Sequence, residues 1–239
     1  IVFVENLKSK PYIDMTLQVL ERFGIRIDRT DYSRFSIPGS QIYQPQKFEV
    51  EGDWSGGAFL LVAGAINGEI TVQGLRPDSR QSDKAILNVL DSAGARTTIM
   101  ENSVGVRKSV LKPFFFDATE SPDLFPPLAA LAAYCRGTST IKGVSRLIHK
   151  ESNRSEALVN EFGKMNIKIE TEGDNMIVTG GKVSGAEVSS HGDHRIAMAA
   201  AVAALAATNK VIIRDSQCVA KSYPAFFDDL RHLGVMVYE

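Results

Sequence analysis

Apolar residues gather in three long runs that carry almost no polar side chain. The runs follow Asp53, Asp123 and Asp193, which are seventy residues apart both times, and read WSGGAFLLVAGAI, LFPPLAALAAYC and HRIAMAAAVAALAA. A helix that is apolar on all sides is buried rather than laid on a surface. Aspartate favours a helix start, because its carboxylate accepts hydrogen bonds from the free N–H groups there. We therefore predict three buried helices, each opened by an aspartate.

The same succession of patterns follows each apolar run. A short β-branched stretch predicts a strand, at 69–75, 139–145 and 210–216. A charged loop and an amphipathic segment then predict a second helix, at 82–95, 153–167 and 224–235. A strand pair is expected to close each unit, as in KIETEGDNMIVT, where Gly173, Asp174 and Asn175 form the turn. The chain therefore predicts a threefold repeat, with buried helices inside and sheets outside.

The first residues repeat the second half of this pattern: a strand at 1–6, a helix at 11–25 and a strand at 26–32. We place a boundary near 47–53. Residues 1–50 are predicted to be a partial unit of a preceding N-terminal globule, and 51–239 a C-terminal globule of three βαβαββ units in the α/β (α+β) class. Because the chain opens inside a β-like run without a methionine, we expect it to be a piece of a longer protein.

Composition narrows the choice of partners. The 239 residues are 44% apolar and 23% charged with a net charge of −1, so a basic site must be local, and we expect neither nucleic acid nor membrane as a partner. The apolar run at 196–207 is shorter than the roughly 20 residues that span a bilayer. Cys135 and Cys218 show no metal-ligand spacing, which indicates a reduced, cytoplasmic compartment and no metal site.

Cations gather in the loops that precede helices. Because the units are equivalent, these loops are expected to share one edge of the fold and to form a rim with three acids; its members are Lys10, Arg146, Lys150, Arg154, Arg195 and Lys221, with Asp123, Glu151 and Asp193 between them. Helix N-termini and arginine both bind carboxylates and phosphates. The rim predicts a pocket for small, highly anionic ligands; the alternative is that these are solvated loop charges near helix caps.

Two acids of this rim, Glu151 and Asp123, each allow two interpretations. Lys150 and Arg154 are four apart at a predicted helix start, which places them on one face with Glu151 beside them. Glu151 can be a simple first-turn acid, or a carboxyl whose pKa rises beside bound anions so that it serves as an acid. Asp123 can likewise be a helix cap or a functional carboxylate. His194 can be a capping or structural histidine.

Five segments together resemble one family, and their order matches it from end to end. They are LKSKPYIDMTL, VEGDWSGGAFLLVAGAI, PDLFPPLAALAAYCRGTSTIKGVSRLIHKESNRSEAL, GDHRIAMAAAV and CVAKSYPAFFDDL. This combination, with its KES-x-R, DHR and AKS-x-P motifs, resembles the 5-enolpyruvylshikimate-3-phosphate synthases. Asn153 and Ser82 depart from the usual Asp and Gly of that family. The resemblance implies two globules of βαβαββ units with the active site between them.

The resemblance also implies a reaction: transfer of the enolpyruvyl group of phosphoenolpyruvate to the 5-hydroxyl of shikimate 3-phosphate, with release of phosphate. It belongs to chorismate and aromatic amino acid biosynthesis and uses no cofactor. Asp123 stands where the family has the carboxylate that binds the 5-hydroxyl and accepts its proton. Glu151 matches the acid that protonates the methylene of phosphoenolpyruvate. Lys150 matches a contact of the shikimate phosphate that also helps phosphate to leave.

Further positions match substrate contacts of the family. The resemblance implies that phosphoenolpyruvate is held by Arg154, Arg195 and Lys221. It implies contacts of shikimate 3-phosphate with Ser9, Tyr12, Asp123, Arg146 and Lys150, and a supporting role for Asp193 and His194. The family's N-terminal lysine and arginine and its Ser-Ser-Gln phosphate site are missing, so we expect this chain alone to bind substrates weakly and to be inactive. We expect the protein to be a monomer.

Three other functions compete with this one. A sister enzyme transfers the same group to a UDP-sugar and shares the fold, although its cysteine lies in an N-terminal globule. A protein like RNA 3′-phosphate cyclase would need a nucleotide site that the sequence does not show. A non-enzymatic module could keep the rim only to bind anions, but two acids such as Asp123 and Glu151 weaken anion binding unless they have a task.

Overall fold

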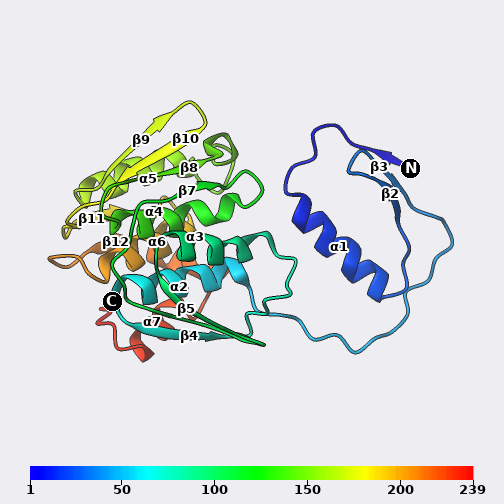
Figure 1. Cartoon of the computed structure of the whole chain (residues 1–239), viewed down its shortest axis with the longest axis horizontal. Helices are drawn as coiled ribbons and strands as arrows, with labels where there is room; N and C mark the ends of the chain where they lie inside the picture. Colours follow the sequence, from blue (N-terminus) through cyan, green and yellow to red (C-terminus); the bar gives the residue numbers. More distant parts are fainter. Residues whose placement is uncertain (239) are drawn as a thin grey trace.

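The computed structural model describes residues 1–238, which form a small and a large lobe (Figure 1). The small lobe holds one helix beside a three-stranded antiparallel sheet of order β1-β3-β2; its elements are β1 (Val2–Phe3), α1 (Lys10–Arg22), β2 (Asp28–Thr30) and β3 (Arg34–Ser36). Residues 37–53 contain neither helix nor strand and run to the large lobe. The expected opening elements are therefore present, joined by a third short strand.

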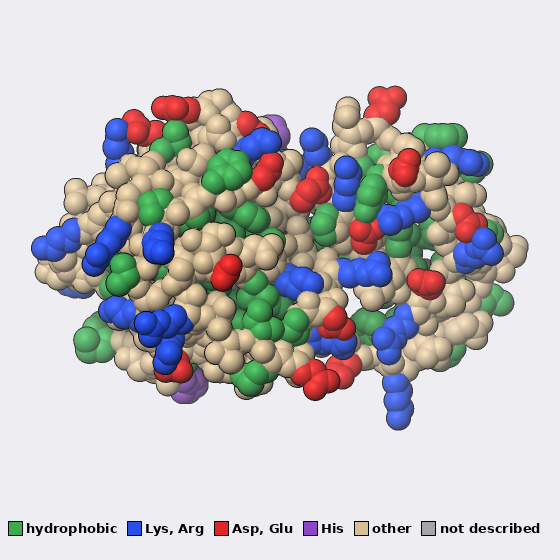
Figure 2. Space-filling model, in the orientation of Figure 1, with side chains coloured by type: hydrophobic (Ala, Val, Ile, Leu, Met, Phe, Trp, Pro, Cys, Tyr) green, Lys and Arg blue, Asp and Glu red, His purple; other side chains and the backbone are tan. Residues whose placement is uncertain are grey.

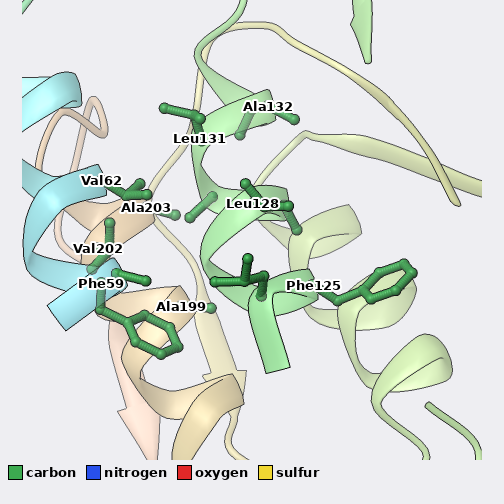
Figure 3. Close-up of a cluster of buried hydrophobic side chains, with 14 of the residues drawn as sticks. Phe59, Val62, Phe125, Leu128, Leu131, Ala132, Ala199, Val202 and Ala203 are labelled. Atoms are coloured by element: carbon green, nitrogen blue, oxygen red, sulfur yellow. The ribbon is translucent and has the colours of Figure 1, made fainter. Parts of the chain in front are cut away.

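Three helices form the centre of the large lobe, and they are the three apolar runs of the sequence: α2 (Trp54–Asn67), α4 (Phe125–Ala133) and α6 (His194–Ala204). Every residue of α4 is buried, and α2 and α6 are buried along almost their whole length. The helices pack against one another in all three pairs. Figure 3 shows side chains of all three meeting, with Phe59, Leu128 and Val202 among them. The prediction of three buried helices is confirmed.

Sheets cover this helical centre. One is antiparallel, of order β4-β6-β5, with strands β4 (Glu69–Gln73), β5 (Arg96–Met100) and β6 (Ser103–Arg107). Helix α2 packs closely on it: a Cβ on Gly64 would lie 2.8 Å from the Val106 carbonyl oxygen, so only glycine fits there. Along strand β10 (Asn175–Thr179) of the next sheet, Met176 and Val178 are buried while Thr179 is exposed, the alternation of a sheet with one face toward solvent.

The second sheet has the order β7-β8-β10-β9, and a third consists of two parallel strands, β11 and β12. The strands are β7 (Phe115–Asp117), β8 (Thr138–Lys142), β9 (Lys168–Glu172), β10 (Asn175–Thr179), β11 (Glu187–Ser189) and β12 (Ile212–Arg214). Strands β7 and β8 are parallel and connected through α4. The predicted strands at 69–75, 139–145 and 210–216 are all present, as β4, β8 and β12.

A second helix follows each of these strands, as predicted. These helices are α3 (Ile86–Ser92), α5 (Arg154–Lys164) and α7 (Phe226–His232); 3-10 turns precede them at η1 (Ser82–Ala85), η3 (Val144–Arg146) and η4 (Ser216–Lys221). Another 3-10 turn, η2 (Pro122–Leu124), leads into α4. Among residues 1–238, no helix combines the length and the apolar character that crossing a membrane requires.

The expectation that a strand pair closes every unit is wrong for the third one. After α7, residues 233–238 form no strand. In the first unit, residues 37–53 supply no strand ahead of α2. The middle unit alone, β7–α4–β8–α5–β9–β10, shows all six elements within the part of the chain that the structure describes.

Candidate active site

The three aspartates that precede the buried helices do not behave alike. Asp53 caps α2 by accepting hydrogen bonds from the backbone N–H groups of Ser55 and Gly56. Asp193 caps α6 by accepting a bond of 2.9 Å from the N–H of Arg195. Asp123 lies one turn earlier, in η2, and caps nothing.

The first turn of α4 explains this difference. Pro126 and Pro127 have no N–H group, so few free donors remain there for an aspartate to accept from. The side chain of Asp123 points instead to cations: Lys150 at 3.1 Å, Arg154 at 2.6 Å and Arg195 at 3.4 Å. The interpretation of Asp123 as a helix cap is therefore wrong.

Arg154 is the centre of the site, and its side chain is 1% exposed. Its Nε and Nη2 donate to the two carboxylate oxygens of Asp193, at 2.7 and 3.3 Å. Its Nη1 donates to Asp123 at 2.6 Å, and its Nη2 also donates to Glu151 at 2.5 Å. The planar guanidinium thus holds three carboxylates in one arrangement, which the compact ammonium of a lysine could not do.

Three further cations surround these acids. Lys150 and Arg195 contact Asp123, and the Lys221 Nζ lies 3.1 Å from a carboxylate oxygen of Glu151. The set, which we call the ion cluster, consists of Asp123, Lys150, Glu151, Arg154, Asp193, Arg195 and Lys221. Figure 2 shows charged side chains of both signs along the junction of the two lobes. Four of the six cations predicted for the rim and its three acids therefore lie together, drawn from four segments far apart in the sequence.

The surroundings of the two candidate acids keep both ionised. Burial would raise the pKa of Asp123, but Arg195, Lys150 and Arg154 outweigh it and lower that pKa to about 2. Burial likewise opposes ionisation of Glu151, but backbone hydrogen bonding, Arg154 and Lys221 lower its pKa to about 2. Because cations cause these shifts, an anion that draws the cations away would raise both pKa values.

His194, at the first position of α6, is buried beside the ion cluster. Burial and the charge of Arg195 lower its pKa, which keeps the imidazole neutral at pH 7. Its Nδ1 has no hydrogen-bond partner among the described residues, so His194 does not cap the helix through that atom.

The loop before α5 corrects one prediction. Helix α5 starts at Arg154 and is capped by Asn153, which accepts a bond of 3.4 Å from the N–H of Glu156. Lys150 and Glu151 therefore lie in the preceding loop, and the prediction that Lys150 shares a helix face with Arg154 is wrong. The side chains of Lys150 and Arg154 nevertheless both contact Asp123. Asn153 performs the capping that an aspartate would perform at this position of the KES-x-R motif.

The small lobe brings its candidate residues to the same junction. The Arg146 Nη2 donates to the Ser9 hydroxyl at 2.8 Å, and Glu120 accepts from the backbone N–H of Lys10 at 2.7 Å. The side chain of Lys10 lies over the ring of Tyr32, 5.4 Å from its centroid, rather than against an acid of the ion cluster. Cation–π contact with an aromatic ring of its own lobe holds it there.

Asp83, in η1, is a residue that the sequence patterns missed. It is fully buried, its Oδ2 accepts a hydrogen bond from the Ser55 hydroxyl, and its Oδ1 has no partner among the described residues. Burial raises the pKa of Asp83 to about 6, and Asp123 adds to the rise, while Ser55 and Arg195 lower it. The sequence offers only an ordinary first-turn acid at this position, so no local signal reveals it.

We expect Asp83→Asn to stabilise the chain at pH 8 and to change its stability little at pH 4. Folding raises the pKa from 3.8 to about 6, so the folded state binds more protons in this window. Stability is then lost as the pH rises from about 4 to 6, by about 3 kcal/mol in all. Asparagine cannot ionise and avoids this loss. Thermal unfolding followed by circular dichroism at both pH values measures it.

The matched control is Asp91→Asn, which changes an exposed acid on α3. It should alter the melting temperature equally little at pH 4 and pH 8. If Asp83→Asn shifted the melting temperature by the same amount at both pH values, the raised pKa would be contradicted.

A cavity of about 630 Å³ lies where the lobes meet, lined by residues of both, including Pro11, Ser82 and Glu120. It contains no member of the ion cluster. Across residues 1–238, no group of three or more His, Cys, Asp or Glu side chains is placed to hold a metal ion.

Comparison with known proteins relates this site to a family. The family model of EPSP synthase (3-phosphoshikimate 1-carboxyvinyltransferase) matches residues 1–230. A 3-phosphoshikimate 1-carboxyvinyltransferase of Clostridium acetobutylicum is 42% identical over 98% of this chain and 54% of the relative, and one of Aeropyrum pernix is 41% identical over 97% and 54%. The chain thus spans about half the length of the curated relatives that it matches.

Solved structures share the fold. An EPSP synthase of Acinetobacter baumannii has a TM-score of 0.79 at 24% identity, covering 90% of this chain and 53% of that one. The enolpyruvyl transferase NikO from Streptomyces tendae has a TM-score of 0.78 at 22% identity, covering 97% and 54%. With a family match over nearly its whole length, the chain belongs to the EPSP synthase (3-phosphoshikimate 1-carboxyvinyltransferase) family.

Proposed function

We propose that the protein transfers the enolpyruvyl group of phosphoenolpyruvate to the 5-hydroxyl of shikimate 3-phosphate, with release of phosphate. The observation that carries this proposal is the pair Asp123 and Glu151, both held by the buried Arg154 among three further cations at the junction of two lobes. An anion site that carries two acids is suited to addition chemistry, because protonating an enol carbon and accepting a hydroxyl proton need one acid and one base.

Within this proposal, the reachable cations bind phosphoenolpyruvate. The Lys221 side chain is 58% exposed and that of Arg195 is 12% exposed, so an anion can approach both. Each of the three guanidinium nitrogens of Arg154 already donates to a carboxylate and the side chain is 1% exposed, so the acids compete with substrate for Arg154. We therefore assign direct contacts to Arg195 and Lys221, and to Arg154 a contact that competes with the acids.

The arrival of substrate then prepares the two acids. Phosphoenolpyruvate brings a phosphate and a carboxylate, which draw Lys221 and Arg195 toward themselves and so raise the pKa values of Glu151 and Asp123. Asp123 accepts the proton of the 5-hydroxyl as that oxygen bonds to C2 of phosphoenolpyruvate. Glu151 gives a proton to C3. The adduct then loses phosphate, whose departure Lys150 stabilises, while Glu151 takes a proton back from the new methyl group and so restores the double bond. The proton held by Asp123 leaves with the phosphate, which returns both acids to their starting state.

Shikimate 3-phosphate is proposed to lie on the side of the small lobe. The hydrogen bond from Arg146 to Ser9 brings two of its predicted contacts together across the junction. Burial is the main cause that raises the pKa of the Tyr12 phenol. The charges of Asp123 and Arg195 also act on this pKa, which places the phenol near both side chains. These positions support a substrate that spans both lobes.

The two lobes support the proposed division at residue 50. The hydrophobic core of the large lobe begins at Trp54 and includes no earlier residue. The small lobe has its own sheet and buries only Ile25 and Phe35 among its hydrophobic side chains. We propose that residues 1–50 belong to a preceding globule and 51–239 to the C-terminal globule of a monomeric, cytoplasmic enzyme. The two unpaired cysteines, Cys135 and Cys218, support a reducing compartment.

An acceptor assay tests the function. The protein encoded by the whole open reading frame that contains this chain is called the full-length protein below. We expect it to release phosphate from phosphoenolpyruvate only when shikimate 3-phosphate is present. UDP-N-acetylglucosamine should give no release, and residues 1–239 alone should be inactive. Release only with the UDP-sugar would assign the protein to the sister reaction, and full activity of residues 1–239 alone would contradict the need for a second globule.

A further inference from the structure

Helix α5 buries two charged side chains on one face, Arg154 and Glu161. They are seven residues apart, which is about two helical turns, so they lie one above the other along the helix. Arg154 belongs to the ion cluster, whereas Glu161 lies outside it. The Glu161 side chain is only 3% exposed. A buried carboxylate is costly unless it is paired and hydrogen-bonded, so its partners explain why it is there.

Three donors satisfy the Glu161 carboxylate. Its Oε2 accepts from the Lys164 Nζ at 2.7 Å and from the backbone N–H of Ser189 at 2.8 Å. Its Oε1 lies 2.8 Å from the Nε2 of His191. Burial would raise the pKa of Glu161, but the hydrogen bonds from these donors outweigh it and lower that pKa. The carboxylate therefore carries no proton, and His191 is the donor in their contact.

The two donors outside α5 belong to the segment 189–193, which leads from β11 into α6. Residues 190–193 form a turn, closed by a hydrogen bond of 2.9 Å from the Asp193 N–H to the Ser190 carbonyl oxygen. The Asp193 carboxylate then returns to α5, where it accepts from Arg154 at 2.7 Å. The segment is therefore fastened to α5 at both ends, to Glu161 at one end and to Arg154 at the other.

The backbone of this turn does not favour a histidine. His191 and Gly192 have φ angles of 54° and 68°, in the left-handed region, where glycine is the ordinary choice and a residue with a Cβ is strained. Strain of this kind points to a task for the side chain. The hydrogen bond to Glu161 supplies that task, because glycine has no side chain that could reach the carboxylate.

We propose that Glu161 and His191 are positioning residues, which fix this turn and so hold Asp193 in place. Asp193 in turn holds Arg154, whose guanidinium donates to both acids that are proposed to transfer protons. The expected effect on catalysis rests on the proposed function. A small misplacement of a catalytic group lowers turnover strongly, so loosening the turn should reduce kcat.

His191→Gly in the full-length protein tests this inference. Glycine removes the imidazole and also relieves the backbone strain, so the turn should still form and circular dichroism should show an intact fold. The kcat for phosphate release should nevertheless fall about tenfold, while the KM for shikimate 3-phosphate stays within about twofold, because the acids and not that substrate lose their alignment. If the histidine only filled a turn position, glycine would leave kcat unchanged.

Variants of the partners separate positioning from general damage. Glu161→Ala should lower kcat by a similar factor. Glu161→Gln should restore most of it, because its amide oxygen accepts from the Ser189 N–H and its amide N–H can donate to His191. Lys164→Met is the matched control: it removes a half-exposed donor that lies on α5 itself, so kcat should stay within about twofold. A kcat of His191→Gly within about twofold of the unsubstituted protein, or an equal loss in Lys164→Met, would overturn the inference.

A failure of the proposed function would be recognised separately. If the unsubstituted full-length protein released no phosphate with shikimate 3-phosphate, the function would be wrong, but the hold on the turn could still be measured. Hydrogen exchange of the Asp193 and Arg195 backbone amides should then be about tenfold faster in Glu161→Ala than in the unsubstituted protein or in Lys164→Met. His191→Gly serves in place of Glu161→Ala if that variant does not fold. Unchanged exchange would overturn the inference independently of any activity.

Discussion

Replacing Asp123 by asparagine in the full-length protein is expected to lower kcat about 1,000-fold, and Glu151→Gln should have an effect of similar size. General acid–base catalysis contributes roughly 100- to 10,000-fold, and each amide keeps the shape of its side chain while losing the proton transfer. Asparagine can still accept a hydrogen bond from Arg154 through its carbonyl oxygen, so the fold should persist. Phosphate release at saturating concentrations of both substrates measures kcat.

The control for these two variants is Glu187→Gln. Glu187 forms an exposed ion pair with Arg214 and lies outside the ion cluster, so kcat should stay within about twofold. A kcat of Asp123→Asn or Glu151→Gln within tenfold of the unsubstituted protein, with circular dichroism showing an intact fold, would remove that residue from proton transfer.

Replacing Arg154 by methionine is expected to destabilise the chain by about 3–5 kcal/mol. The side chain of Asp193 is 0% exposed, so losing its guanidinium partner leaves a buried, uncompensated charge. Asp123 and Glu151 lose a partner at the same time. Methionine has a similar length and apolar stem, so the cost comes from charge rather than from a large cavity. Urea unfolding at pH 7 measures the change in the free energy of unfolding.

Two further variants test the cause of that loss. Asp193→Asn in the Arg154→Met background should recover part of the stability, because asparagine removes the buried charge and still caps α6. Arg214→Met breaks an ion pair whose partners are 64% and 54% exposed, so water screens it and the free energy of unfolding should change far less than in Arg154→Met. If Arg154→Met cost no more than Arg214→Met, the central role of Arg154 in the ion cluster would be contradicted.

The elements of the fold were predictable because their signals are local. The three apolar runs can only be buried helices, and short β-branched stretches after them favour strands, so α2, α4 and α6 and the strands β4, β8 and β12 follow from pattern alone. The missing closing pair after α7 was not predictable from the repeat. A strand forms only where enough chain and a partner strand are present, and residues 233–238 supply neither.

Most members of the ion cluster were predictable from the sequence, but their connections were not. The cations and acids in the loops led to the prediction of an anion pocket. The contact between Arg154 and Asp123 was not predictable, because it joins residues 31 positions apart and depends on how α4 and α5 pack. Pro126 and Pro127 did carry a signal: without their N–H groups, Asp123 has little to cap. Asp83 carried none, because its surroundings come from segments distant in the chain, among them Ser55, which donates a hydrogen bond to it. The roles of the acids come from the family resemblance.

The central claim is that the phosphate released comes from phosphoenolpyruvate and that the acceptor is the 5-hydroxyl of shikimate 3-phosphate. Phosphorus NMR of the full-length protein with both substrates tests it most directly. We expect the signal of phosphoenolpyruvate to be replaced by that of inorganic phosphate, while the 3-phosphate on the shikimate ring remains esterified and proton spectra show a new enol ether. Loss of the shikimate phosphate, or release of phosphate from phosphoenolpyruvate without any acceptor, would contradict the account.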